Sequence, residues 1–435
     1  MARPRTVTPT EAPRPPAATG GSLALTTWGL FAGLAVLIVG VGLFATVIGV
    51  RAEVEGFGTL AIGAIGAAYY AGFVVGSRLA LHVVGTVGHI RVYAALSSLL
   101  AAVVLAAGLF VHPLSWLLLR FLGGVLIAGV YVVAESWLNQ IATSTNRARL
   151  LSVYGVVTVM PYGVGQILLG AVDPLGLAAF TVAAVAITVA VSPVTLSAVA
   201  NPPPVSVPAR IGLAELLRIA PTGIVTSFVS GIAMGAVTAF APVYATRAGM
   251  SPGAVGVFTA MPAVGSLLLQ VPVASLSDRV DRRLVGALAA AAAAGSTVLL
   301  LVDGPSGVLG HVAMVCLGGT MFPLYSIAGA YTNDRLPRER LTAAASQLVV
   351  LFGVGAFMGP FIMAAVLGGI GLDGYPIAAT TMLGFVSLFL LVRIVQHPAA
   401  ERVHPDQLVA LDELATQIPA TVVAMGRRLR PRRRA

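Results

Sequence analysis

Two ionisable side chains stand well inside one long apolar stretch, and they are the residues best placed for chemistry. Arg120 and Glu135 both fall in the fourth of a series of such segments. A charge at membrane depth costs at least about 2.5–3.5 kcal/mol on insertion scales, so something must compensate each of them. They are fifteen residues apart, about 22 Å along a helix, and therefore cannot pair with one another.

The two charges share one face of the expected helix. At 100° per residue, Tyr131 lies about 20°, Gly124 about 40° and Glu135 about 60° from Arg120 around the axis. We expect this polar stripe to face an interior cavity, with Arg120 in the outer half of the span and Glu135 toward its inner end. Arg120 is then either a cavity cation that binds substrate or modulates a proton site, or a side chain satisfied by backbone carbonyls of adjacent helices.

Glu135 also has two interpretations. Its carboxyl could take up and release a proton as the cavity opens alternately to the two sides of the membrane. It could instead form an ion pair at the inner end of the span with Arg78, Arg91 or Arg149. Of these two interpretations we favour the ion pair.

Other polar side chains within apolar segments could line the same cavity. Each could equally be a packing or interface residue, above all the tyrosines, which bury a ring and keep a polar tip. These candidates are Tyr69, Tyr70, Tyr162, Gln166, Gln270, Tyr325, Ser326 and Gln347.

Twelve apolar segments position these residues, and each is long enough to cross a hydrocarbon core of about 30 Å as a helix. Hydrophobic residues make up 57% of the 435 residues and charged residues 10%, which excludes a soluble domain of ordinary composition. The sequence therefore predicts an all-α polytopic membrane protein. Clear examples of the segments are 28–50, 56–77, 92–111, 150–172, 174–199 and 284–302.

The arginines set the expected orientation. All 26 basic residues are arginine, and 23 lie in the amino-terminal tail, in alternate loops or from Arg393 onward. This asymmetry predicts that the protein lies in the cytoplasmic membrane of the cell, with both termini on the cytoplasmic side. The net charge of +10 would suggest nucleic acid for a soluble chain, but here it lies in short loops and the tail. Anionic lipid headgroups are thus the expected counterions.

The segments divide six and six around three consecutive prolines, which cannot continue a helix. The expected organisation is a disordered cytoplasmic tail (1–26), a six-helix bundle (27–200), a cytoplasmic linker (201–218), a second bundle (219–395) and a basic cytoplasmic tail (396–435). In the last tail, leucines at three- and four-residue spacing over 405–418 favour an amphipathic helix at the inner membrane surface. A solvated helix is the alternative.

The two halves repeat each other weakly. Arg147–Leu150 connects segments four and five, and Arg338–Leu341 connects ten and eleven, an offset of 191 residues. Gly85–His89 corresponds to Asp278–Arg282 at nearly the same offset. Internal symmetry of this kind is typical of transporters whose halves move about a site near the membrane midplane.

Three motifs resemble the Major Facilitator Superfamily over roughly residues 25–395. The stretch Ala274–Arg283 resembles the superfamily's loop signature, in which a small residue precedes Leu-Ser-Asp-Arg and paired basics. Arg120 followed by Gly124 resembles its intramembrane Arg-x-x-x-Gly motif. Glu135–Asn139, with the following arginine loop, resembles one bacterial branch of these permeases. Glycine and proline in 160–165 and 353–360 resemble an antiporter-associated motif, which favours exchange.

The resemblance implies two pseudo-symmetric six-helix bundles and a conformational latch. In that latch Asp278 faces the start of segment five, and Arg279 and Arg282 follow it. Arg282 would pair with the acid that ends segment ten, Asp334. The alternative is that these are solvated loop charges. The first half departs from the pattern, because the corresponding stretch 76–91 contains no acid.

The sequence thus predicts a secondary active transporter that moves a small organic solute by alternating access, with proton-coupled efflux as one form. The nearly neutral cavity suits an amphipathic or weakly polar solute. We expect a monomer without cofactor, metal site or enzymatic activity, since the six histidines are scattered and no phosphate-binding Gly-x-x-x-x-Gly-Lys loop occurs. The alternatives are a non-transporting sensor derived from a permease and a multi-pass membrane enzyme.

Overall fold

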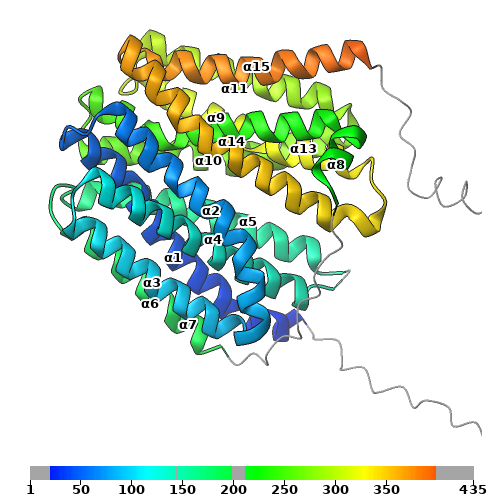
Figure 1. The fold of residues 1–435 in the computed structure, drawn as a ribbon, viewed down its shortest axis with the longest axis horizontal. Helices are drawn as coiled ribbons and strands as arrows, with labels where there is room; N and C mark the ends of the chain where they lie inside the picture. The colour runs from blue at the N-terminus through cyan, green and yellow to red at the C-terminus, as the bar shows by residue number, and fades with distance from the viewer. Residues whose placement is uncertain (1–19, 144, 198–210, 398–435) are drawn as a thin grey trace, which may run out of the picture. The chain divides into compact units, whose positions relative to one another are not determined.

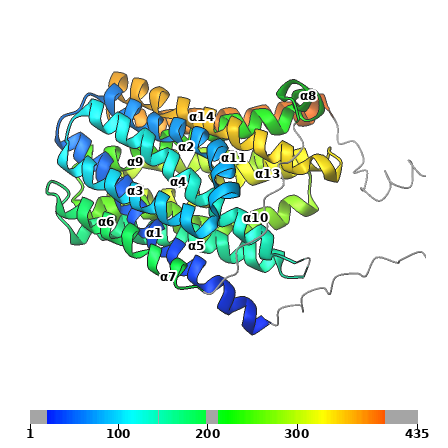
Figure 2. The ribbon, with the colours of Figure 1, turned by 60° about the horizontal axis from the view of Figure 1, so that its bottom comes forward.

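Helices account for every regular element in the part of the chain that the computed structural model describes, residues 20–143, 145–197 and 211–397. The chain can be followed from α1 to α15 in Figure 1 and Figure 2. Within these ranges, 12 helical spans are long and apolar enough to cross a membrane. The predicted all-α polytopic fold is therefore confirmed.

The element bounds show that most spans are single helices. The elements are α1 Gly20–Val54, α2 Thr59–Val87, α3 His89–Leu109, α4 Pro113–Ile141, α5 Arg147–Ile167, the short 3-10 turn η1 Leu168–Ala171, α6 Ala178–Val189, α7 Val191–Thr195, α8 Leu213–Ile219, α9 Pro221–Arg247, α10 Pro252–Arg279, α11 Arg282–Asp303, α12 Val308–Met321, α13 Pro323–Asn333, the turn η2 Arg338–Arg340, α14 Leu341–Ile370 and α15 Gly374–Gln396.

Proline interrupts two spans that the sequence predicts as continuous. The sixth span is divided into α6 and α7, with Pro193 inside α7, and the tenth into α12 and α13 at Pro323. A proline has no backbone N–H to donate and crowds the preceding turn, so a break at or near it is expected.

Helical structure extends into two segments that the sequence places outside the bundles. α1 begins at Gly20, although residues 20–26 were expected in the disordered tail; unlike residues 1–19, they contain no proline. The end of the expected linker folds as α8, whose Leu-Ala-Glu-Leu-Leu-Arg-Ile sequence consists mostly of good helix formers. The expected amphipathic stretch 405–418 lies outside the described residues.

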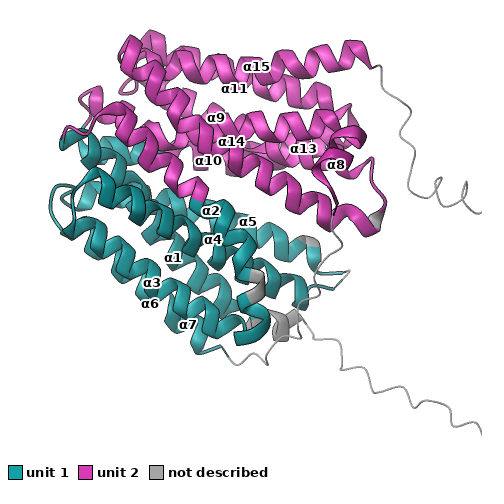
Figure 3. Cartoon of the chain, in the orientation of Figure 1, with its two compact units in different colours: residues 1–55, 72–205, 251–260 teal, residues 56–71, 206–250, 261–435 magenta. Residues whose placement is uncertain are grey.

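The chain forms two compact units, shown in Figure 3. Unit 1 consists of residues 1–55, 72–205 and 251–260, and unit 2 of residues 56–71, 206–250 and 261–435. The first part of α2 is thus grouped with α9 and α14. There Gly63 lies against Pro360 and Ala364 of α14, where a larger side chain would collide with both.

In unit 1, α1 packs against α5 and α6, and α3 packs against α4 and α6. Glycines allow α1 and α5 to approach closely. A Cβ added to Gly42 would overlap with the backbone of Tyr162, and one added to Gly165 would overlap with that of Val39. Small residues at such crossings are typical of packed membrane helices.

Unit 2 repeats this construction with α9 and α14. A Cβ on Gly231 would overlap with the Phe352 carbonyl, and one on Gly355 would overlap with the Phe228 carbonyl. α11 packs against α12 and α15, and α9 also contacts α13 and α15. Close glycine contacts therefore join the first and fifth spans of each half.

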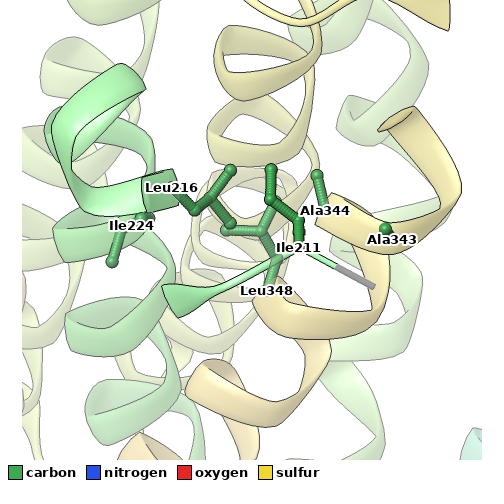
Figure 4. Packing of buried hydrophobic residues seen from close by; sticks show 6 residues of the cluster. All are labelled: Ile211, Leu216, Ile224, Ala343, Ala344 and Leu348. Atoms are coloured by element: carbon green, nitrogen blue, oxygen red, sulfur yellow. The ribbon is translucent and has the colours of Figure 1, made fainter. Parts of the chain in front are cut away.

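The linker is anchored where it enters unit 2. Ile211, just before α8, and Leu216 of α8 are buried in a cluster with residues of α9 and α14, shown in Figure 4. Glu215 forms an ion pair with Arg340 at 2.5 Å, and the Gln347 amide donates to the Ile211 carbonyl at 3.1 Å. The remaining members of the cluster are Ile224, Ala343, Ala344 and Leu348.

Candidate functional site

α4 carries both intramembrane charges because one unbroken helix runs the length of the span. It is 29 residues long and begins after His112, whose ring nitrogen accepts from the Leu114 N–H at 3.3 Å. Pro113 occupies its first turn, where a missing N–H costs nothing. Arg120 therefore lies near the start of α4 and Glu135 near its end.

Glu135 is exposed, and its carboxylate accepts a hydrogen bond from the Tyr154 hydroxyl of α5 at 3.0 Å. The favoured ion pair with Arg78, Arg91 or Arg149 is not formed among the described residues. A neutral phenol thus stands where a cation was expected. The sequence does not identify Tyr154 as a partner, because the pattern of residues does not show which face of α5 meets α4.

Two further tyrosines complete this part of unit 1. Tyr131, one turn before Glu135, packs against Phe73 with ring centroids 6.2 Å apart. Tyr162 and Glu135 both lie close enough to Tyr131 to interact with it electrostatically. We call Tyr131, Glu135, Tyr154 and Tyr162 the α4–α5 site. It combines one carboxylate with three phenols.

Arg120 lies toward the opposite end of α4 from Glu135. Its side chain is half-buried, and the guanidinium carbon lies 5.5 Å from the centroid of the Phe44 ring of α1. An aromatic face attracts a cation by its quadrupole, with about 2 kcal/mol or more when the pair is desolvated. Gly124, one turn along, is buried. Part of the compensation that the charge requires therefore comes from Phe44.

Tyr69, Tyr70 and Gln270 have polar or aromatic partners among the described residues. In unit 2, the Tyr70 and Thr238 hydroxyls lie 2.7 Å apart, and the Tyr69 and Tyr70 rings meet edge to face. The bond between the Tyr70 and Thr238 hydroxyls joins two helices, and such bonds contribute about 0.6 kcal/mol on average in membrane proteins. Within α10, Ser266 donates to the side-chain oxygen of Gln270 at 2.8 Å.

The remaining candidates have different surroundings. In unit 2, Tyr325 packs on Phe352 and borders the linker cluster, while Ser326 is exposed. Gln347 is half-buried and holds the Ile211 carbonyl as described above. Gln166, in unit 1, is buried. None of these four belongs to the α4–α5 site.

The loop between α10 and α11 forms a charge cluster around Arg282. Its guanidinium donates to Asp334 at 2.6 Å and to Asp278 at 2.7 Å. The pairing with Asp334 is the one that the resemblance implies. Arg279 is exposed. Arg282 itself is only 15% exposed, whereas Asp334 is 45% and Asp278 68% exposed, so solvent screens each pair and keeps it weak.

Arg283, the next residue, joins α11 to α15. It is 5% exposed, pairs with Asp281 at 2.7 Å and donates to the backbone carbonyls of Arg393 and His397. Hydrogen bonds from this guanidinium hold the pKa of the Asp281 carboxyl below its usual value. The second of the paired basics is therefore a structural residue.

The corresponding place in the first half uses neutral groups. His89, at the start of α3, is buried, and its Nε2 lies 3.1 Å from the Ser136 hydroxyl of α4. Its ring also meets Trp137 edge to face. Where the second half has an arginine between two carboxylates, the first half thus has a histidine–serine contact, next to Glu135 in sequence.

A comparison with known families identifies this arrangement of two helical bundles. The family model of the Major Facilitator Superfamily matches residues 23–360 and 224–428. The chain belongs to the Major Facilitator Superfamily. It is therefore a multi-pass membrane protein of a transporter family, as the loop signature around Asp278 predicts.

A relative of known sequence supports the same family assignment. The uncharacterized MFS-type transporter YcaD of Escherichia coli O139:H28 is 27% identical over 373 residues, which cover 85% of this chain and 95% of YcaD. Two solved structures have the same fold. The nucleoside transporter NupG is 13% identical with a TM-score of 0.67, and the match covers 86% of this chain and 100% of NupG. A D-xylose-proton symporter is 12% identical with a TM-score of 0.66, and the match covers 84% of this chain and 96% of the symporter.

Proposed function

We propose that this Major Facilitator Superfamily protein moves a small organic solute across the cytoplasmic membrane by alternating access, in exchange for protons. The observation that carries the proposal is Glu135, an exposed carboxylate within a span whose hydrogen-bond partner is a phenol. A charge facing lipid there would be costly, so the carboxylate is expected to face water in a cavity.

Glu135 suits a proton carrier better than a structural role. A structural carboxylate in a membrane is normally paired with a cation, and the described residues provide no such ion pair for it. Uptake of a proton would neutralise the carboxylate, and Tyr154 can hydrogen-bond to either form. The interpretation as a structural ion pair loses its main support.

The arrangement of arginines supports cytoplasmic termini, with the Arg282 cluster on the cytoplasmic side. Proline inside α5 and α14, at Pro161 and Pro360, is consistent with helices that bend during exchange. Exchange for protons under an inward proton gradient would drive export of the solute.

Transport into proteoliposomes tests the proposal. A panel of labelled neutral, anionic and cationic organic compounds is offered with and without an imposed pH gradient. We expect at least one compound to accumulate above its equilibrium level only when the gradient is present. Uptake that ignores the gradient would remove proton coupling, and uptake of no compound would contradict transport itself.

The cluster around Arg282 gives a second test. If the cluster exists in one conformation only, Arg282→Asp and Asp334→Arg should each change the rate of solute uptake, by about fivefold for roughly 1 kcal/mol. The double exchange should restore part of the rate, because it rebuilds the pair between positions 282 and 334 with opposite polarity while Asp278 then faces a like charge. Equal rates in all four proteins would show that these are solvated loop charges.

A further inference from the structure

The α4–α5 site narrows the proposed small organic solute to one chemical class. Resting on the proposed transport function, we infer that its solute carries a cationic head, such as a substituted ammonium, which binds against Glu135 among the tyrosines. The head displaces the proton from the same carboxylate. The substrate class is therefore an organic cation.

The first support is the charge of the site. Glu135 contributes a negative charge, and the other members of the site, Tyr131, Tyr154 and Tyr162, are neutral phenols. Arg120, on the same helix, is about 22 Å away along the axis and faces Phe44. No ion pair balances the ionised carboxylate among the described residues. A proton or a cationic ligand can supply that charge.

The second support is the kind of side chain around the carboxylate. Tyrosine rings present a negative face and a phenol oxygen, and both attract a cation. A cation held against aromatic faces gains about 0.5–2 kcal/mol from each, the more so when water is excluded. Tyr131 is also held in place, since its ring packs on Phe73. An anionic solute would instead meet a like charge.

The same geometry explains exchange without a second binding site. A proton moves from the Glu135 carboxyl to water as the cation arrives, and it returns when the cation leaves. Among the described residues, the titratable groups at the carboxylate are Tyr154, which donates to it, and Tyr131, and His89 of α3 contacts the adjacent Ser136. Because both ligands need the ionised carboxylate, they cannot bind together, and each cycle exchanges one for the other.

Equilibrium binding to the purified full chain tests the inference with tetraphenylphosphonium as probe and tetraphenylborate, of the same shape and opposite charge, as its counterpart. We expect the cation to bind and the anion not to bind. Glu135→Gln should weaken cation binding by at least about tenfold and remove its decline at low pH. Glu339→Gln, the same change on an exposed carboxylate in η2, is the matched control and should bind like the wild type.

Tyr154→Phe separates the charge of the site from its phenol donor. It keeps the carboxylate and the ring but removes the hydroxyl that donates to Glu135, so cation binding should weaken by about threefold, less than in Glu135→Gln. Thermal unfolding of each variant confirms that it is folded. Unchanged affinity in folded Glu135→Gln, or equal binding of the borate, would overturn the inference. Accumulation of only neutral or anionic compounds in proteoliposomes would overturn it too, while leaving the transport proposal intact.

Discussion

Glu135→Gln is expected to abolish proton-driven accumulation of the solute in proteoliposomes while leaving a folded protein. Gln cannot exchange a proton, so the cycle loses its coupling ion and solute can at most reach equilibrium. Its amide can still hydrogen-bond to Tyr154, which preserves the contact between α4 and α5 seen at 3.0 Å. The expected loss of gradient-driven accumulation is at least about tenfold, measured as the ratio of uptake with and without a pH gradient.

His89→Gln provides the comparison on the neighbouring helix. His89 is titratable and contacts Ser136, but it does not touch the carboxylate in the structure. Gradient-driven accumulation should survive this change. Accumulation that persists in Glu135→Gln and disappears in His89→Gln would assign proton coupling to the histidine instead.

Gly355→Leu is expected to cause the largest loss of stability. The glycine lies where α14 crosses α9, and any Cβ there overlaps with the Phe228 carbonyl. A backbone atom cannot rotate away, so the two helices must separate along their contact. Overpacking typically costs 1–3 kcal/mol, and we expect about 3 kcal/mol here because the obstacle is backbone. Thermal unfolding in detergent measures the effect.

Gly384→Leu serves as the control for this substitution. Gly384 is also inside a helix, α15, but a Cβ built on it meets nothing within 4 Å. It should lower the unfolding temperature little or not at all. Equal destabilisation by both variants would mean that replacing a glycine by leucine within a helix lowers stability by itself, without any effect of the α9–α14 crossing.

The sequence predicts the spans well because hydropathy is a local property. Runs of uncharged residues long enough to cross a bilayer can be counted without knowing their neighbours, and Arg120 and Glu135 are visible as interruptions. The pairing of Arg282 with Asp334 was also accessible, through the loop signature. Each of these features depends on one segment or one motif.

What sequence reasoning could not provide is the partner across a helix contact. Whether Glu135 meets an arginine or Tyr154 depends on how α5 is turned against α4, and close glycine contacts such as those of Gly42 and Gly165 fix the neighbouring crossing of α5 with α1. Likewise, Gln347 could line a cavity as far as its position on the helix shows, but it holds the Ile211 carbonyl. A polar residue within a span predicts that a polar contact exists, but it does not identify the partner.

The packing of Gly63 against Pro360 and Ala364 bears on how the molecule is made. Chains are synthesised at about 5–20 residues per second, so the first part of α2 leaves the ribosome tens of seconds before α14 exists. Throughout that interval, Gly56–Ala71 lacks the surface on which it finally rests. Nascent α2 must therefore wait in the bilayer, partly unassembled, until nearly the whole polypeptide has been inserted.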